Sequence, residues 1–174
     1  AYGVYCGIKA CAREKFGTAD LKGRRVAVQG MGAVGYALAQ YLAKDGASLV
    51  IADIHDDVLE KAKAEFGASV SVVEPVRIHA ADVDVFAPCA LGAGLNDRTI
   101  PEIKAAIIGG AANNQLAEPR HDLMLMERGI IYAPDYAINS GGITSVGYEY
   151  FHRTGRNPYS YALTRPSMMD HVAR

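Results

Sequence analysis

Short apolar runs alternate along the chain with segments whose apolar residues recur at helical spacing. The runs suited to buried strands are residues 25–29, 48–52, 69–73, 82–87, 105–109 and 129–133. Helices are predicted at 1–16, 33–45, 56–66 and 122–128, with a short one from 74 and a last one from 141 to beyond 151. Strands that alternate with helices at this spacing are typical of a parallel sheet. The pattern predicts a Rossmann-type, doubly wound α/β fold with a mainly parallel sheet and helices on both faces.

Composition and charge exclude several classes of function. The chain has 174 residues, half of them apolar and about a fifth charged, with a formal net charge of -1. This is the composition of one globular domain without the basic stripe of a nucleic-acid-binding protein. No basic-then-apolar leader and no run of about 20 apolar residues is present. We therefore expect a cytoplasmic protein that binds neither nucleic acid nor membranes.

The cysteines and histidines do not form a metal-binding pattern. Cys6, Cys11 and Cys89 are an odd number without a CxxC pair, and the five histidines lack metal-ligand spacing. A disulfide framework or a structural zinc site needs a different arrangement. We predict no metal site, and we interpret Cys6 and Cys11 as small thiols packed in the first helix.

A glycine-rich turn gives the sharpest local signal. It lies between the strand 25–29 and an alanine-rich helix, and it reads Gly30, Met31, Gly32, Ala33, Val34, Gly35. In this context Gly30 allows the tight turn, Gly32 lets a pyrophosphate approach the backbone, and Gly35 lets the helix pack closely. The free amides at the helix start would bind the phosphates. The alternative is a purely structural strand-to-helix turn.

The second strand ends in a carboxylate that indicates which dinucleotide would bind. Asp53 follows Gly35 by 18 residues, where an acidic side chain can accept hydrogen bonds from both ribose hydroxyls. It would repel a 2′-phosphate, and the segment from Ile54 to Asp57 offers no Arg or Lys to bind one. We therefore predict NAD as the cofactor, with Asp53 and Ile54 in its site. Asp53 as a helix cap is the alternative, although Asp56 and Asp57 are also placed to cap.

Further motifs follow the later strands and identify a reaction class. They are Ala87-Pro88-Cys89-Ala90-Leu91-Gly92, Asn113-Asn114-Gln115-Leu116 and Ala133-Pro134-Asp135-Tyr136-Ala137-Ile138-Asn139-Ser140-Gly141-Gly142. Together with Ala1-Tyr2-Gly3-Val4, they resemble the glutamate, leucine, phenylalanine and valine dehydrogenase superfamily, most closely its leucine dehydrogenase branch. The resemblance covers the chain to about residue 150 and is more specific than the glycine turn.

The resemblance implies roles for several residues. The Cys89-Ala90 backbone would lie beside the adenosine and nicotinamide ribose, and Asn113 and Asn114 would border the nicotinamide. Asn139 would contact both the nicotinamide end and the carboxylate of the amino-acid substrate. From the residues alone, Cys89 is as well explained by a packed thiol, the Asn113-Asn114 pair by an Asx turn, and Asn139 by a helix cap. Asp135 is expected to cap or brace its loop.

The resemblance also implies a division of the protein. Residues 1–154 would form the NAD-binding domain, whose first helix (1–16) enters from an N-terminal substrate domain outside this sequence. Residues 155–174 would be a tail, either disordered or packed on that domain. In the family, the catalytic lysine lies on the absent domain, and the lysines here have the setting of solvated surface residues. We name no catalytic residue and expect the chain alone to be inactive.

The implied function is therefore that of half an enzyme. The full-length protein would be a homo-oligomer that deaminates a branched-chain or related L-amino acid to its 2-oxo acid and ammonia. Residues 143–150 depart from the stretch that shapes the side-chain pocket in relatives, so the amino acid stays open. The alternative function is a non-catalytic, NAD-responsive binding module.

Overall fold

A single six-stranded parallel sheet forms the centre of the molecule. The computed structural model describes residues 1–142, 146–147, 150 and 153. All strand pairs are parallel and the strand order is β3-β2-β1-β4-β5-β6. The strands are β1 (Arg25–Gln29), β2 (Ser48–Ala52), β3 (Val70–Val72), β4 (Val85–Pro88), β5 (Ile107–Ile108) and β6 (Ile131–Tyr132). This is the Rossmann order, so the predicted fold class and all six predicted strands are confirmed.

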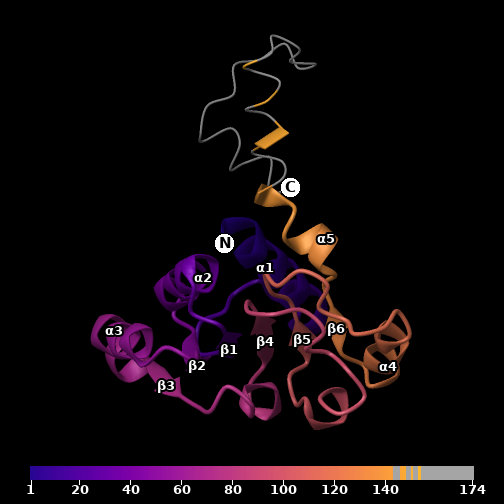
Figure 1. Cartoon of the computed structure of the whole chain (residues 1–174), viewed down its shortest axis with the longest axis horizontal. Coiled ribbons are helices and arrows are strands. Elements are labelled where there is room, and N and C mark those ends of the chain that lie inside the picture. Colours follow the sequence, from indigo (N-terminus) through magenta and orange to yellow (C-terminus); the bar gives the residue numbers. More distant parts are fainter. Residues whose placement is uncertain (143–145, 148–149, 151–152, 154–174) are drawn as a thin grey trace.

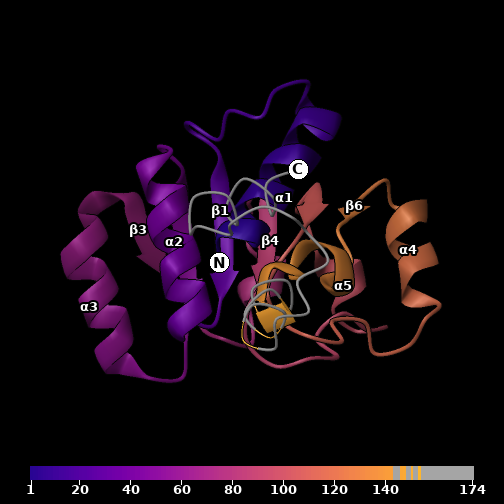
Figure 2. The same cartoon turned by 90° about the horizontal axis from the view of Figure 1, so that it is seen from above.

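In the described chain up to residue 140, five α-helices and three 3₁₀ turns precede, connect or follow the strands. The helices are α1 (Tyr2–Phe16), α2 (Ala33–Lys44), α3 (Asp56–Phe66), α4 (His121–Glu127) and α5 (Asp135–Ile138). The 3₁₀ turns are η1 (Gly67–Ser69), η2 (Ile78–Ala80) and η3 (Ile100–Glu102). Figure 1 and Figure 2 show α3 and α4 at opposite ends of the sheet, beside its edge strands.

One predicted helix is a 3₁₀ turn, and one short helix was not predicted. Another predicted helix, the last one, lies mostly outside the described residues. The short helix expected from residue 74 is the 3₁₀ turn η2. The sequence analysis missed α5, whose single turn begins directly after Pro134, an extended residue. A four-residue turn is too short to show helical periodicity. Gly141 and Gly142 are helical, but most of the predicted final helix and the tail 155–174 fall outside the described residues.

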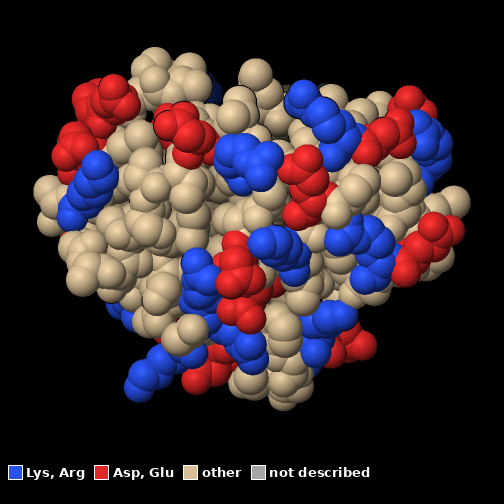
Figure 3. All heavy atoms as spheres, turned by 90° about the horizontal axis from the view of Figure 1, so that it is seen from below, with Lys and Arg blue, Asp and Glu red and all other residues tan. Residues whose placement is uncertain are grey.

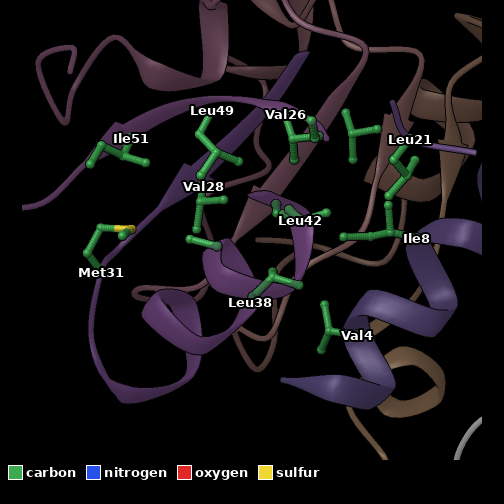
Figure 4. Packing of buried hydrophobic residues seen from close by; sticks show 14 of the residues in the cluster. Val4, Ile8, Leu21, Val26, Val28, Met31, Leu38, Leu42, Leu49 and Ile51 are labelled. Atoms are coloured by element: carbon green, nitrogen blue, oxygen red, sulfur yellow. The ribbon is translucent and has the colours of Figure 1, made fainter. Parts of the chain in front are cut away.

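The core consists of two apolar clusters, one on each face of the sheet. Successive side chains of a strand point to opposite faces, so Val26 and Val28 of β1 join one cluster while Ala27 joins the other. The first cluster packs α1, α2 and α3 on the sheet, and Figure 4 shows Val4, Ile8, Leu38 and Leu42 directed toward the strands. The second packs η2, η3 and α4 through residues that include Ile78, Ile100 and Leu125. Helices and 3₁₀ turns therefore cover both faces.

The strand order reverses at β1, which positions the candidate site. β1 pairs with β2 on one side, Gln29 opposite Ala52, and with β4 on the other, Gln29 opposite Pro88. The segments that follow β1, β2 and β4 therefore begin next to one another at the carboxyl edge of the sheet. In open α/β sheets ligands bind in the crevice at such a reversal.

The surface carries charges of both signs. On the face shown in Figure 3, Lys and Arg side chains alternate with Asp and Glu. Ion pairs such as Arg24–Asp84 and Arg25–Asp82, both at 3.0 Å, contribute to this mixing. No helix in the described part of the chain is long and apolar enough to cross a membrane.

The contact between α1 and α5 yields a first testable prediction. A Cβ on Gly7 would lie 2.8 Å from Ile138 Cδ1, and the same atom lies 2.9 Å from the hypothetical Cβ position of Gly109. Ile138 therefore packs closely against two glycines, and a methyl group at Gly7 would have to displace it. We expect Gly7→Ala to lower the free energy of unfolding by about 1–3 kcal/mol, because overpacking outweighs the gain of up to about 1 kcal/mol in helix propensity.

Urea unfolding followed by circular dichroism measures this effect. In an Ile138→Ala background the same Gly7→Ala substitution should be neutral or stabilising. A stabilising effect of Gly7→Ala in the wild-type background would contradict the packing argument.

Candidate functional site

The glycine-rich turn packs closely against the protein at two of its glycines and is open at the third. Gly30 has a φ of 90°, and a Cβ there would lie 2.9 Å from the Cβ of Ala90. A Cβ on Gly35 would overlap the carbonyl oxygen of Gly30, so α2 packs against the turn only without a side chain there. Beside Gly32, by contrast, no atom of the described residues except its chain neighbours lies within 4 Å of a Cβ position. The turn is thus tight where it contacts the protein and open where a ligand would approach.

The start of α2 has no side-chain cap. Gly32 occupies the N-cap position in an extended conformation and supplies no side chain, and the first turn holds no acidic residue. Unpaired amides and the helix dipole favour an anion at such a position. Met31 contributes only its backbone here, because its side chain is 2% exposed and packs in the core (Figure 4).

Asp53 fastens the glycine turn to the end of β2. Its Oδ2 accepts a hydrogen bond of 2.6 Å from the Met31 amide, and its Oδ1 accepts one of 3.0 Å from the His55 amide. His55, which occupies the N-cap position of α3, makes no side-chain capping bond. Asp53 is therefore a brace rather than a helix cap. Each carboxylate oxygen has a second lone pair that can accept a further bond.

A cavity of about 670 Å³ opens beside Asp53. Ile54 lines it and is 81% exposed. Arg77, which follows β3, also lines it and was missed by the sequence analysis because it is distant from Asp53 along the chain. Its guanidinium lies 3.5 Å from a carboxylate oxygen of Glu102, so an acidic partner already faces this cation.

The Cys89-Ala90 segment lies against the glycine turn. The Cys89 amide donates to the carbonyl of Gln29 at 2.7 Å, which continues the pairing of β4 with β1. Burial raises the pKa of the Cys89 thiol to about 11, and a backbone hydrogen bond from Ala111 offsets this only in part. A thiol with a raised pKa is a poor nucleophile at neutral pH. The packed-thiol interpretation of Cys89 fits this environment.

The Asn113-Asn114 pair lies in a loop braced by an acidic side chain. Asn114 has a left-handed φ of 51°, and its amide donates to Asp135 Oδ2 at 2.8 Å. Asp135 was expected to cap or brace its own loop, and in the structure it braces the loop after β5 instead. The carbonyl of Asn114 accepts from the Ala93 amide at 2.7 Å, and a Cβ on Gly92 would lie 2.6 Å from the Asn113 carbonyl oxygen. The loops after β4 and β5 are therefore in direct contact.

Asn139 ends α5 and reaches across to the same loop. Its side-chain Nδ2 donates to the Ala111 carbonyl at 2.8 Å and lies 3.4 Å from Asn113 Oδ1. No donor among the described residues reaches its Oδ1, which can accept a bond from a ligand. The side chain is thus used between two loops and not as a helix cap. A cavity of about 250 Å³ beside it is lined by residues 1–4, Ile138, Asn139, Gly141 and Gly142.

The predicted site residues follow one edge of the sheet in strand order. Asp53 follows β2, the glycine turn follows β1, Cys89 follows β4, Asn113 follows β5 and Asn139 follows β6. Because parallel strands end on the same side, these groups line a continuous carboxyl edge. In the described part of the chain no group of three or more His, Cys, Asp or Glu residues is arranged to bind a metal ion.

The raised pKa of the Cys89 thiol leads to a pH prediction. A shift from 9.0 to about 11 leaves about 100-fold less thiolate at pH 8. We expect iodoacetamide to label Cys89 very slowly at pH 8, and the rate to rise through pH 10 as the thiol ionises. Mass spectrometry of labelled peptides measures both. Rapid labelling of Cys89 at pH 8 in the folded protein would contradict the assignment.

Comparison with known proteins identifies the family. Residues 1–164 match the sequence profile of the Glutamate/Leucine/Phenylalanine/Valine dehydrogenase family. Leucine dehydrogenase of Geobacillus stearothermophilus is 51% identical over 151 residues, which are 87% of this chain and 41% of that protein. L-tryptophan dehydrogenase of Nostoc punctiforme is 48% identical over 145 residues, 83% of this chain and 40% of that protein. The chain therefore spans about two fifths of the length of these relatives.

Solved structures agree with the sequence comparison. The crystal structure of the Nostoc punctiforme L-tryptophan dehydrogenase matches with a TM-score of 0.87 and 41% identity, covering 98% of this chain and 48% of that one. A hetero-hexameric glutamate dehydrogenase from Thermus thermophilus matches at 0.74 with 22% identity, covering 99% and 43%, and it supports the fold alone. The chain belongs to the glutamate, leucine, phenylalanine and valine dehydrogenase family.

Proposed function

We propose that this chain is the NAD-binding domain of an enzyme that oxidatively deaminates a branched-chain or related L-amino acid. The reaction is reversible and yields the 2-oxo acid and ammonia. The observation that carries the proposal is the arrangement along the carboxyl edge of the sheet, with Asp53 and the glycine turn near the reversal in strand order and Asn139 after β6, each beside its own cavity. The relatives named for leucine and tryptophan support an amino acid as the substrate.

The cofactor end of the crevice fits a dinucleotide. The open space beside Gly32 and the uncapped start of α2 suit a pyrophosphate, while Ala33 and Val34 contribute the first helical amides. Bound NAD would supply the hydride acceptor, and this chain's residues would hold and orient it. The exposed side chain of Ile54 would form an apolar wall near the adenosine.

The charge beside the ribose favours NAD over NADP. Asp53 would accept bonds from the ribose hydroxyls while it keeps its bonds to the Met31 and His55 amides. A 2′-phosphate would meet this carboxylate in the same cavity. Arg77 also lines the cavity, but Glu102 faces its guanidinium and weakens its attraction for a phosphate.

The substrate end of the crevice carries polar groups that the protein has already oriented. Asn113 would border the nicotinamide, with the backbone of Cys89 and Ala90 beside its ribose. The Oδ1 of Asn139 would accept from a ligand N–H, and the adjoining cavity at Gly141 and Gly142 would admit part of the amino acid. We propose Asn139 as the substrate-binding residue of this chain.

The chemical groups for deamination would come from elsewhere in the protein. Activation of water needs a lysine with a lowered pKa. Here the hydrogen bond and ion pair of 2.8 Å with Asp45 raise the pKa of Lys9. Lys15 donates to the Gly129 carbonyl and Lys63 pairs with Glu60. We propose that a substrate domain supplies the catalytic lysine in a cytoplasmic homo-oligomer.

Dinucleotide titration tests the cofactor assignment. We expect calorimetry to show saturable binding of NAD by the chain and much weaker binding of NADP. Asp53→Ala should weaken NAD binding about 10- to 100-fold, because it removes hydrogen bonds to a charged acceptor worth about 1.5–3 kcal/mol. Asp56→Ala, which removes a neighbouring carboxylate from the same cavity, is the matched control and should leave NAD affinity unchanged. Equal binding of NAD and NADP would overturn the assignment.

A turnover assay tests whether the catalytic groups lie outside this chain. We expect this chain, supplied with NAD and leucine, valine, phenylalanine or tryptophan, to produce no NADH. Absorbance of the reduced nicotinamide measures the outcome. Protein extended to the length of its relatives should be active. NADH formation by the chain alone would show that the catalytic groups lie within it.

A further inference from the structure

Gln115 is a buried polar residue that none of the roles above uses. Its side chain is only 1% exposed, although it follows a loop at the edge of the crevice. The Nε2 group donates to the Gly110 carbonyl at 2.9 Å and to the Ala112 carbonyl at 3.0 Å. Both of its amide hydrogens are therefore used. Its Oε1 is buried and has no hydrogen-bond partner among the described residues.

The two bonds of Gln115 determine where the carbonyl between them points. Gly110 and Ala112 direct their carbonyls toward Gln115, while the carbonyl of Ala111 accepts from Asn139 Nδ2 at 2.8 Å. Ala111 lies in a bend between these two residues. Because Gln115 holds the carbonyls on both sides of the bend, it restricts the orientation of the Ala111 carbonyl, which is bonded to Asn139.

The other contacts of this loop leave it little freedom. The Ala112 amide donates to the Pro88 carbonyl at 2.9 Å, and a Cβ on Gly110 would overlap that same carbonyl. The loop therefore lies against the end of β4 on one side and on the Gln115 amide on the other. The position of the loop therefore depends on the two hydrogen bonds from Gln115, and an apolar side chain at position 115 could not make them.

We propose that Gln115 is a positioning residue for the nicotinamide end of the site. By holding Gly110 and Ala112, it orients the Ala111 carbonyl, which anchors Nδ2 of Asn139 and leaves Oδ1 of Asn139 directed to the ligand. The inference rests on the proposed function, because it takes Asn139 as the group beside the nicotinamide. Gln115 itself touches neither cofactor nor substrate.

Comparing two ligands distinguishes effects at the nicotinamide end of the site from effects at the adenosine end. NAD occupies both ends, whereas ADP-ribose has the adenosine and pyrophosphate but no nicotinamide. We expect Gln115→Met, which keeps the side-chain length but removes both donors, to weaken NAD binding about tenfold in calorimetry. Its affinity for ADP-ribose should stay unchanged, which also shows that the variant is folded. Asp53→Ala is the reverse control and should weaken both ligands.

A double-mutant cycle tests whether Gln115 acts through Asn139. Asn139→Ala should weaken NAD binding to a similar extent, and the double variant should be no weaker than the single ones, because both break the same connection. Gln115→His, which keeps one ring N–H donor at the same reach, should restore part of the affinity. A merely structural role would instead lower affinity for NAD and ADP-ribose alike.

The outcomes separate this inference from the proposed function. If the wild-type chain binds neither ligand, the cofactor assignment fails and the inference fails with it. If the chain binds NAD no better than ADP-ribose, or if Gln115→Met binds NAD like the wild type, Gln115 has no positioning role while the NAD site stands. Additive losses in the double variant would likewise overturn the connection through Asn139.

Discussion

The position of β1 between two parallel neighbours is the constraint on which the rest of the structure depends. β1 pairs with β2 and with β4, so chain segments far apart in the sequence must begin at one level of the sheet. Its residues Val26, Ala27 and Val28 are fully buried, and both apolar clusters include residues of this strand. Because a strand buried on both faces cannot shift its register without exposing apolar surface, the carboxyl edge is fixed by the core. The crevice is thus a product of packing before any polar group is considered.

Close backbone contacts then join the loops of this edge into one body. Three glycines allow these contacts because they have no side chain. Ala90 packs against Gly30, the Asn113-Asn114 backbone packs against Gly92, and the Pro88 carbonyl packs against Gly110. Each contact would be blocked by a side chain, so glycine is required by the neighbouring loop as much as by a ligand. Polar groups complete the connection, since buried backbone amides and carbonyls need partners. The loop after β4 is therefore in direct contact with the loops after β1 and β5.

The sequence predicted the sheet and the glycine turn because both are encoded locally. Apolar runs mark buried strands, and the turn is recognised by its spacing between a strand and a helix. The bonds that orient the site are different. Asp53 reaches Met31 across 22 positions, and Asp135 reaches Asn114 across 21. No periodicity signals such pairs. The role of Gln115 was also missed, because its Gly110 and Ala112 partners are backbone carbonyls that any residue would supply.

Under the proposed function, the same bonds would prepare the cofactor for a reaction whose catalytic groups lie elsewhere in the protein. Hydride transfer requires donor and acceptor atoms at close distance and fixed orientation, and much of the barrier is removed when the binding groups are already in place. In this crevice the Asp53 carboxylate, the Asn114 amide and the Nδ2 of Asn139 are all held by the protein's own bonds. Lone pairs of Asp53 and the Oδ1 of Asn139 remain available. Under the proposed function, a cofactor would therefore bind to groups whose orientation the protein's own bonds already fix.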